Sequence, residues 1–311
     1  MAAQIPTSLG DASVAFVGLG RMGAAMVGRL LDAGIPLAVY NRTASKADPF
    51  VEQGATRLDR LTDAAGYDLV FTMVTDDAAL DALHDPAEGL LSAGTAPAVW
   101  IDGSTVSVEA AQRAAAAAHA AGAAYVSAPI SGNPPTVAAG NAIFCISGDE
   151  AAQDVTEELL GHIGRAVWRA GDAAQANVVK LCVNALLAVT MQSVAEIAVL
   201  ADRAGVSRAA LMAFLNDSAV GSPFTRYKTA NVVELEFPPT FTPEGQRKDV
   251  RLALDLSHEL EVPMPVLNTT EVAFSRLVSG GLGEGRDFAA LILEVARDAG
   301  YELTAEKLPT A

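Results

Sequence analysis

The chain has 311 residues, of which 51% are hydrophobic, so it can bury a sizeable core, and its length suggests two domains. Its formal net charge of -16 argues against a basic nucleic-acid-binding surface and suits a soluble, cytoplasmic protein. The first thirteen residues lack a basic segment followed by an apolar one, and charges interrupt the Ala-rich stretches before they reach the length of a membrane span. We therefore expect no signal peptide and no membrane partner.

Metal or disulfide chemistry finds little support in the sequence. Cys145 and Cys182 are the only cysteines, and both lie in apolar stretches, which predicts two buried, reduced thiols. The four histidines are scattered, with no H-x-x-x-H pair and none beside a cysteine. We expect no metal site.

Strands and helices alternate through residues 1–171, after an N-terminal arm over 1–13 that we expect to be frayed. This order predicts an α/β domain with a Rossmann-like, doubly wound, mainly parallel sheet. The expected strands are 14–18, 36–40, 69–74, 98–101, 124–126 and 142–146, and the expected helices include 22–33, 43–53 and 107–121.

The pattern changes near residue 172, beyond which no convincing strand is found. Residues 173–204 read as one long helix that is apolar on more than one side, which indicates burial on several sides and suits a subunit interface. We therefore expect an all-α C-terminal domain over 172–311, joined by this long helix. Its further helices are expected at 207–216, 224–235, 243–260, 266–279 and 288–299.

A glycine-rich turn between the first strand and the first helix carries the clearest functional signal. Gly18, Gly20 and Gly23 form a G-x-G-x-x-G pattern with a strand before it and a helix after it. The first glycine permits the tight turn, the second lets a pyrophosphate approach the backbone, and the third lets helix and strand pack closely. Because free N–H groups at the helix start favour phosphate, we expect a dinucleotide to bind Gly18, Leu19, Gly20, Arg21, Met22 and Gly23.

The end of the second strand indicates which dinucleotide binds. An NAD site usually has an acidic residue there that bonds the ribose 2′-hydroxyl, whereas this chain has Asn41, Arg42 and Thr43, with Lys46 one helical turn later. Arg42 can lie against a 2′-phosphate, and Asn41 and Thr43 can donate hydrogen bonds to it. The sequence therefore predicts NADP, with NADPH preferred over NADH. Met73 and Val74, at the end of the third expected strand, complete the expected cofactor contacts on this side.

Lys180 and Asn184 are four residues apart on the long helix, so they share one face in an otherwise mostly apolar stretch. Such a lysine either snorkels to water or is held for chemistry. Beside a nicotinamide, its ammonium group can donate the proton that a carbonyl oxygen needs after hydride transfer. The amide of Asn184 can hold the lysine or the substrate.

Two loops follow strand ends, where such sheets bind ligands. Backbone N–H groups and the hydroxyl of Ser131, in the segment 127–135, can form an anion site for a substrate carboxylate, or the segment is an ordinary Pro/Gly turn. Ser104 and Thr105, in the Asp-Gly-Ser-Thr segment 102–105, can reach the nicotinamide amide or merely cap the next helix.

Together these residues resemble the β-hydroxyacid dehydrogenases, a family that includes 3-hydroxyisobutyrate dehydrogenases and tartronate and succinic semialdehyde reductases. The resemblance covers nearly the whole chain, and its motifs stand in the family's order. They are the nucleotide signature at 18–26, the NADP-type Asn-Arg-Thr at 41–43, the D-x-S-T loop at 102–105, the substrate loop at 128–132, the G-x₈-K-x₃-N helix at 171–184, Phe241 with the Lys-Asp segment at 248–253, and Asp-Phe-Ala-Ala at 287–290.

The resemblance implies the roles of several residues. Lys180 is implied as general acid in reduction and general base in oxidation, with Ser131, Gly132 and Asn184 binding the substrate. Lys248 is implied to lie over the cofactor, with Asp249 and Phe241 near the substrate pocket. The family also implies a C-terminal domain like that of 6-phosphogluconate dehydrogenase and a homodimer or homotetramer.

One departure from the family bears on the substrate. Members that act on small hydroxy acids usually carry Ser-Gly-Gly, whereas this chain has Asn133 in place of the second glycine, followed by two prolines. The side chain of Asn133 either adds a hydrogen bond in the substrate pocket or reduces its space, so the identity of the acid stays open.

Three functions are compatible with the sequence. The first is an NADP-dependent oxidoreductase that interconverts a short β-hydroxyacid and its semialdehyde. The second is an imine reductase or reductive aminase; these resemble the same family but usually have Asp or Tyr where this chain has Lys180. The third is a catalytically silent NADP-binding protein on the same fold, against which Lys180 also counts.

Overall fold

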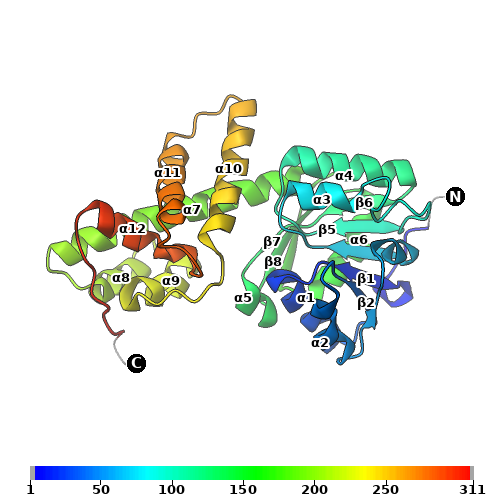
Figure 1. Cartoon of the computed structure of the whole chain (residues 1–311), viewed down its shortest axis with the longest axis horizontal. Helices are drawn as coiled ribbons and strands as arrows, with labels where there is room; N and C mark the ends of the chain where they lie inside the picture. Colours follow the sequence, from blue (N-terminus) through cyan, green and yellow to red (C-terminus); the bar gives the residue numbers. More distant parts are fainter. Residues whose placement is uncertain (1–3, 309–311) are drawn as a thin grey trace. The chain divides into compact units, whose positions relative to one another are not determined.

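The structure, a computed structural model, describes residues 4–308. By their internal contacts these residues form two compact units, the first ending at Lys180 and the second beginning at Leu181. The division falls inside the long helix α7, Gln175–Arg203 (Figure 1). The last strand ends at Gly171, where the sequence places the end of the first domain. That 171 and 172 mark a domain boundary stays a prediction.

The first unit contains a nine-stranded sheet in the order β3-β2-β1-β4-β5-β6-β8-β7, with β9 paired to β8. The run from β3 to β6 is parallel, whereas β8 is antiparallel to both β6 and β7. The chain thus winds one way from β1 to β3 and the other way from β4 to β6, which confirms the predicted doubly wound fold. The strands are β1 Val14–Val17, β2 Leu37–Tyr40, β3 Thr56–Arg57, β4 Leu69–Thr72, β5 Val99–Asp102, β6 Ala124–Ser127, β7 Ile130–Ser131, β8 Ile143–Gly148 and β9 Ala166–Gly171.

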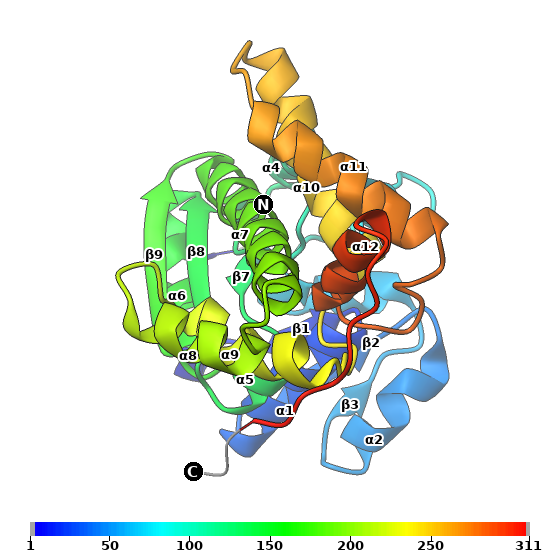
Figure 2. The same cartoon turned by 90° about the vertical axis from the view of Figure 1, so that its left-hand side faces the viewer.

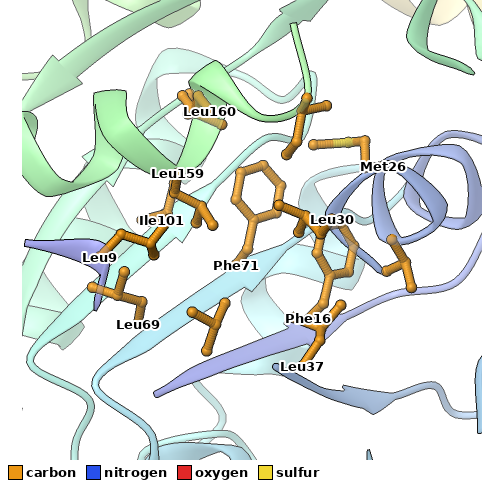
Figure 3. Packing of buried hydrophobic residues seen from close by; sticks show 14 of the residues in the cluster. Leu9, Phe16, Met26, Leu30, Leu37, Leu69, Phe71, Ile101, Leu159 and Leu160 are labelled. Carbon is orange, nitrogen blue, oxygen red and sulfur yellow. The ribbon is translucent and has the colours of Figure 1, made fainter. Parts of the chain in front are cut away.

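Apolar side chains on both faces of the strands explain why helices cover the sheet on two sides. On one face, Phe16 and Phe71 stack with ring centroids 4.9 Å apart beneath α1 (Arg21–Asp32) and α6 (Glu150–Gly161), as Figure 3 shows. On the other face, Val17, Val70 and Trp100 pack with residues of α3 (Asp77–Leu83) and α4 (Val108–Ala121). Every central strand is buried, so the turns at the strand ends are held by a rigid base.

Two expectations near the N-terminus were wrong. The arm over 1–13 is packed where it is described: Leu9 is buried in the core, and its N–H donates to a Glu158 carboxylate oxygen at 2.7 Å. Residues 1–3 of that arm lie outside the described residues. The helix expected at 43–53 divides into a 3-10 turn, Ala44–Ala47, and the short α2, Asp48–Val51, because Pro49 lacks an N–H and favours the first turn of a new helix.

Other differences from the predicted elements lie in segments with a weak sequence pattern. The sequence analysis missed β3 and β7, which have two residues each and show no periodicity, and β9, whose Trp168 is exposed. It also missed the short helix α5, Pro134–Ala138. Cys182 is exposed, contrary to expectation, since the helix that carries it is covered on some sides only.

The second unit is helical, as predicted. Its helices begin at clear signals: hydroxyl side chains of Ser207, Ser222 and Thr242 cap three of them, and proline follows two of these caps. α10 and α11 run side by side as a hairpin (Figures 1 and 2). After α7 the helices are α8 Arg208–Asp217, α9 Pro223–Glu234, α10 Pro243–Glu259, α11 Pro265–Ser279 and α12 Leu291–Asp298.

One buried cation organises the end of the second unit. Arg208 is fully buried and donates to the carbonyls of Val232 and Val233, in the last turn of α9, and to that of Thr304. It also forms ion pairs with Asp202 and Glu306. The guanidinium thus satisfies carbonyls at a helix C-terminus, where positive charge is favourable, and it ties the C-terminal segment to α8 and α9.

Candidate cofactor and catalytic site

The glycine turn after β1 has the conformation that a dinucleotide site requires. Gly18 has φ +103°, and a Cβ there would lie 2.2 Å from the Met73 carbonyl oxygen. A Cβ on Gly23 would lie 1.9 Å from the Gly18 carbonyl oxygen, so helix α1 can pack against β1 only without a side chain at this position. Gly20, which caps α1 without offering a side chain to its first N–H groups, faces open space. These residues fit a pyrophosphate approaching the start of α1.

The Asn41 side chain, predicted to donate a hydrogen bond to a 2′-phosphate, bonds to the backbone of two turns. Its Oδ1 accepts a hydrogen bond from the Leu19 N–H at 2.8 Å, and its Nδ2 donates to the Thr43 carbonyl at 3.0 Å. The amide therefore binds the glycine turn and the turn after β2 to each other. Arg42, Thr43 and Lys46 are exposed beside it.

A buried polar network joins the turns after β4 and β5. Asp102 is 1% exposed, and its Oδ1 accepts from the Thr72 hydroxyl at 2.6 Å and from the Ser104 hydroxyl at 2.8 Å. The Ser104 oxygen in turn accepts from the Val74 N–H at 2.9 Å. Ser104 thus links two turns instead of pointing an unused hydroxyl at a ligand. Burial raises the pKa of Asp102 to about 6, although the hydrogen bonds from Thr72 and Ser104 act to lower it.

The predicted substrate loop is short and capped. Ser131 ends β7 and is half-buried, and Gly132 has φ +155°. The Asn133 Oδ1 accepts from the Thr136 N–H at 2.9 Å and from its hydroxyl at 2.7 Å, so this side chain caps α5. Asparagine before two prolines is a helix-start pattern that the sequence contains, and the sequence analysis did not use it.

A polar cluster at α7 and α10 contains three of the predicted residues. Asn184 and Asp249 are both buried, and the Asn184 Nδ2 donates to Asp249 Oδ2 at 2.5 Å. The Lys248 ammonium lies 3.0 Å from Asp249 Oδ1. Gln246, which the sequence analysis missed, donates to the Asn184 carbonyl at 2.9 Å. Lys180, half-buried, lies one turn before Asn184 on the same face of α7.

Phe241 is held by the Asp-Phe-Ala-Ala stretch. Its N–H donates to Asp287 Oδ2 at 3.1 Å, and its carbonyl accepts from the Phe288 N–H at 2.9 Å. Asp287 is fully buried and forms an ion pair with the buried Lys228, whose ammonium lies 4.5 Å from the Phe288 ring centroid. Burial lowers the pKa of Lys228, and the adjacent Asp287 acts to raise it. The sequence gives no signal for Lys228, because a lysine on a helix is usually exposed.

The structure groups the predicted residues in two places. The turns after β1, β2, β4 and β5 lie together at the carboxyl edge of the sheet, since Val17 is in register with Tyr40 and Thr72, and Thr72 with Asp102. Asn184, Lys248 and Asp249 form the polar cluster of the second unit. The first group lies at the point where the strand order reverses, which is where such sheets bind ligands. A doubly wound sheet with this glycine turn, followed by a helical unit, defines an NAD(P)-dependent oxidoreductase fold.

Comparison with known proteins identifies the family. Residues 13–184 match the NAD binding domain of 6-phosphogluconate dehydrogenase, and residues 174–295 match the NAD-binding domain of NADP-dependent 3-hydroxyisobutyrate dehydrogenase. The chain belongs to the β-hydroxyacid dehydrogenase family. It is 33% identical to glyoxylate/succinic semialdehyde reductase 1 of Arabidopsis thaliana over 90% of this chain and 96% of that protein.

Solved structures agree with this assignment. The 3-hydroxyisobutyrate dehydrogenase of Mycobacterium tuberculosis with L-serine has a TM-score of 0.81 and 26% identity, covering 91% of this chain and 98% of that one. A reductive aminase from Aspergillus terreus, in complex with NADPH4, cyclohexanone and allyl amine, has a lower TM-score of 0.58 at 25% identity, covering 90% of this chain and 98% of that one. The relatives therefore support a nicotinamide-dependent oxidoreductase of the hydroxyacid dehydrogenase type.

The raised pKa of Asp102 predicts how stability depends on pH. Between the ordinary value of 3.8 and about 6, the folded protein keeps a proton that the unfolded chain has lost, so the free energy of unfolding falls as pH rises. The whole loss is on the order of 3 kcal/mol, of which about 1 kcal/mol falls between pH 5 and pH 7.5. Urea unfolding at these two pH values should show this loss in the wild type relative to Asp102→Asn. An equal change in both proteins would contradict the assignment.

Proposed function

We propose that the protein is an NADP-dependent oxidoreductase that interconverts a short β-hydroxyacid and its semialdehyde, with Lys180 as the general acid in reduction. The observation that carries the proposal is the arrangement on α7. Lys180 stands one turn from Asn184, and the amide of Asn184 is fixed by the buried carboxylate of Asp249. A half-buried ammonium beside an oriented amide can protonate a carbonyl oxygen while that oxygen gains negative charge.

The remaining residues have supporting roles in this proposal. The cofactor supplies the hydride when bound. The Ser131 hydroxyl and the backbone N–H groups at Gly132 and Asn133 bind the substrate carboxylate. By the family resemblance, we assign Asn184 to orienting the substrate, Lys248 to holding the cofactor, and Phe241 and Asp249 to contacts with the substrate. Because the Asn133 side chain caps α5, its effect on the substrate is through the shape of the loop.

The substrate class is supported by the relatives. The Arabidopsis protein reduces glyoxylate and succinic semialdehyde by its name, and the Mycobacterium structure holds L-serine, which is itself a β-hydroxyacid. The alternative, imine reduction, is supported by the similarity to the Aspergillus reductive aminase. The TM-score of that structure is lower than that of the Mycobacterium dehydrogenase. A lysine at position 180 suits protonation of an oxygen, so we favour the hydroxyacid reaction. A cytoplasmic location stays a prediction from composition.

The role of Lys180 is tested by Lys180→Ala, with glyoxylate and succinic semialdehyde as substrates and NADPH as reductant. Loss of a positioned acid should lower kcat on the order of 10²–10⁴-fold, while the Kd for NADPH, measured by fluorescence titration, stays within about threefold. Lys307→Ala, which removes an exposed lysine from the C-terminal segment, is the matched control. Near-wild-type kcat in Lys180→Ala would contradict the role.

The NADP preference is tested by Arg42→Ala. Removing the exposed guanidinium after β2 should weaken NADPH binding on the order of tenfold or more and leave NADH binding nearly unchanged, because only NADPH carries the 2′-phosphate. Arg57→Ala is the control, since Arg57 lies on the neighbouring β3 and pairs with Asp48. Equal losses for both dinucleotides in calorimetric titrations would refute the assignment.

We also propose that the protein is a homodimer that uses α7. By length and composition α7 is the one helix among residues 4–308 that could cross a membrane, but Met191 and Ala195 are buried in the core of the second unit. Four of its exposed apolar side chains, in two pairs three residues apart, form a stripe that a second copy can cover: Val183, Leu186, Ile197 and Leu200.

Sedimentation equilibrium should give twice the chain mass of 32.0 kDa. The double variant Leu186→Glu, Leu200→Glu should sediment as a monomer, because charges would replace the most exposed apolar groups of the stripe. Val220→Glu, at an exposed site between α8 and α9, should leave the dimer intact. A dimer that persists in the double variant would place the interface elsewhere.

A further inference from the structure

The turn after β4 and the turn after β5 are tied by side chains. Ser104 donates its hydroxyl proton to Asp102, its oxygen accepts from the Val74 N–H, and its own N–H lies 3.3 Å from Asp102 Oδ2. Thr72, at the end of β4, donates to the same carboxylate. Thr72 and Val74 belong to the end of β4 and the turn after it, and Asp102 and Ser104 to the end of β5 and the turn after it. We expect the nicotinamide end of the cofactor to bind in these two turns.

The carboxylate is surrounded by donors and has no cationic partner within residues 4–308. On this side of the sheet the neighbouring strand β6 carries Tyr125, helix α3 carries Asp77 and Asp81 and is followed by His84, and helix α4 carries Glu109, Arg113 and His119. Tyr125 interacts electrostatically with Asp102, whereas Asp77 accepts from the Ser107 N–H and His84 pairs with Asp81. Arg113 of α4 also pairs with Asp81. Asp102 is thus held by hydrogen bonds alone.

We propose that the ionised carboxylate of Asp102 is a positioning group for the cofactor: through Thr72 and Ser104 it fixes the turns after β4 and β5 relative to each other. This inference rests on the proposed function, since it assumes that these turns bind NADP. The effect is indirect, because Asp102 is buried beneath the turns and acts through the residues that it holds.

The chemistry of the network requires an acceptor at this position. The Thr72 oxygen already accepts from the Trp100 indole N–H at 2.9 Å, so the Thr72 hydroxyl proton must be donated onward. The Ser104 oxygen likewise accepts from the Val74 N–H. A protonated acid or an amide can keep one oxygen as the acceptor of both hydroxyls, but its added donor then stands at the Oδ2 position. There it meets the Ser104 N–H and displaces Ser104 from its place between the two turns.

Trp100 provides a direct reporter of this network. Its indole N–H donates to Thr72, which donates to Asp102, so two hydrogen bonds separate the fluorophore from the carboxylate. Trp100 is fully buried, and the other tryptophan of the chain, Trp168, is exposed. In a Trp168→Phe background, the fluorescence therefore comes from Trp100 alone.

The experiment uses the full chain with Asp102→Asn and Ser104→Ala in that background. Thr156→Val, a buried hydroxyl on α6 of the same unit, is the control. Fluorescence is followed from pH 5 to 8 in the free protein, and the Kd for NADP⁺ is measured at pH 7.5 and pH 5.5. Since the 2′-phosphate itself titrates near pH 6, the difference between each variant and its parent isolates the protein's contribution.

We expect a fluorescence transition near pH 6 in the parent and none in Asp102→Asn. At pH 7.5 the Kd for NADP⁺ should rise about tenfold in Asp102→Asn and by a smaller factor in Ser104→Ala, which loses the link from Asp102 to Val74 and keeps the hydrogen bond from Thr72 to Asp102, and it should stay unchanged in Thr156→Val. The Asp102→Asn effect should shrink at pH 5.5, where the parent is itself protonated. A purely structural role would instead lower stability without this dependence of affinity on pH.

The outcomes separate this inference from the proposed function. If the parent binds NADP⁺ and Asp102→Asn binds it equally well at pH 7.5, the inference is wrong and the function stands. A fluorescence transition that persists in Asp102→Asn would come from another group and would also overturn it. If the parent binds no NADP(H), the proposed function falls and the inference falls with it.

Discussion

The proposed cofactor site depends on side chains that join neighbouring turns at the carboxyl edge of the sheet. Parallel strands bring these turns side by side, but hydrogen bonds within the sheet end where the strands end. Asn41 extends the order to the glycine turn through the Leu19 N–H, and Ser104 does the same between the turns after β4 and β5. The backbone around the expected pyrophosphate and nicotinamide positions is therefore fixed in the protein itself, which lowers the entropy that binding must lose.

The second unit uses buried charges in a comparable way. The side chains of Lys228, Asp287 and Arg208 are removed from water, which is costly unless every polar atom finds a partner. Lys228 pairs with Asp287, and Arg208 pairs with the partly exposed Asp202 and Glu306. In both cases the partners include a backbone group of a segment without regular structure: the Phe241 N–H in one and the Thr304 carbonyl in the other. The charged pairs thus fix irregular segments, and the first of them positions a residue of the proposed substrate pocket. Removal of one partner alone would leave a buried charge unpaired.

The sequence predicted the architecture well where local signals and periodicity agreed. The glycine turn, the doubly wound sheet and the helical second unit follow from patterns that short stretches display on their own. The segments it missed or misassigned depend on distant contacts: Leu9 is buried because Glu158 and the core hold it, and β9 exists because β8 lies beside it. The same limit applies to the site. Strand-end motifs singled out Asn41 and Ser104, and the departure from the family pattern singled out Asn133. Each of these side chains bonds to a neighbouring group that only the fold brings near or orients.

The family membership narrows the chemistry, and the open question is whether an oxygen or a nitrogen receives the proton. Both reactions use a reduced nicotinamide dinucleotide on this fold, and both need a group near the reacting double bond that can supply a proton. A lysine ammonium beside a fixed amide, together with the proposed carboxylate-binding role of the loop at Ser131, fits a substrate with a carbonyl and a carboxylate. A ketone and an amine without a carboxylate would leave the loop at Ser131 and Gly132 without a ligand.

The most direct measurement is NADPH oxidation with a panel that separates these substrates. Glyoxylate, succinic, methylmalonic and tartronic semialdehydes are compared with cyclohexanone in the presence of a primary amine. The account predicts turnover of at least one carboxylated aldehyde, and little with the ketone and amine together. Turnover only with the ketone and amine pair, and none with any carboxylated aldehyde, would contradict it.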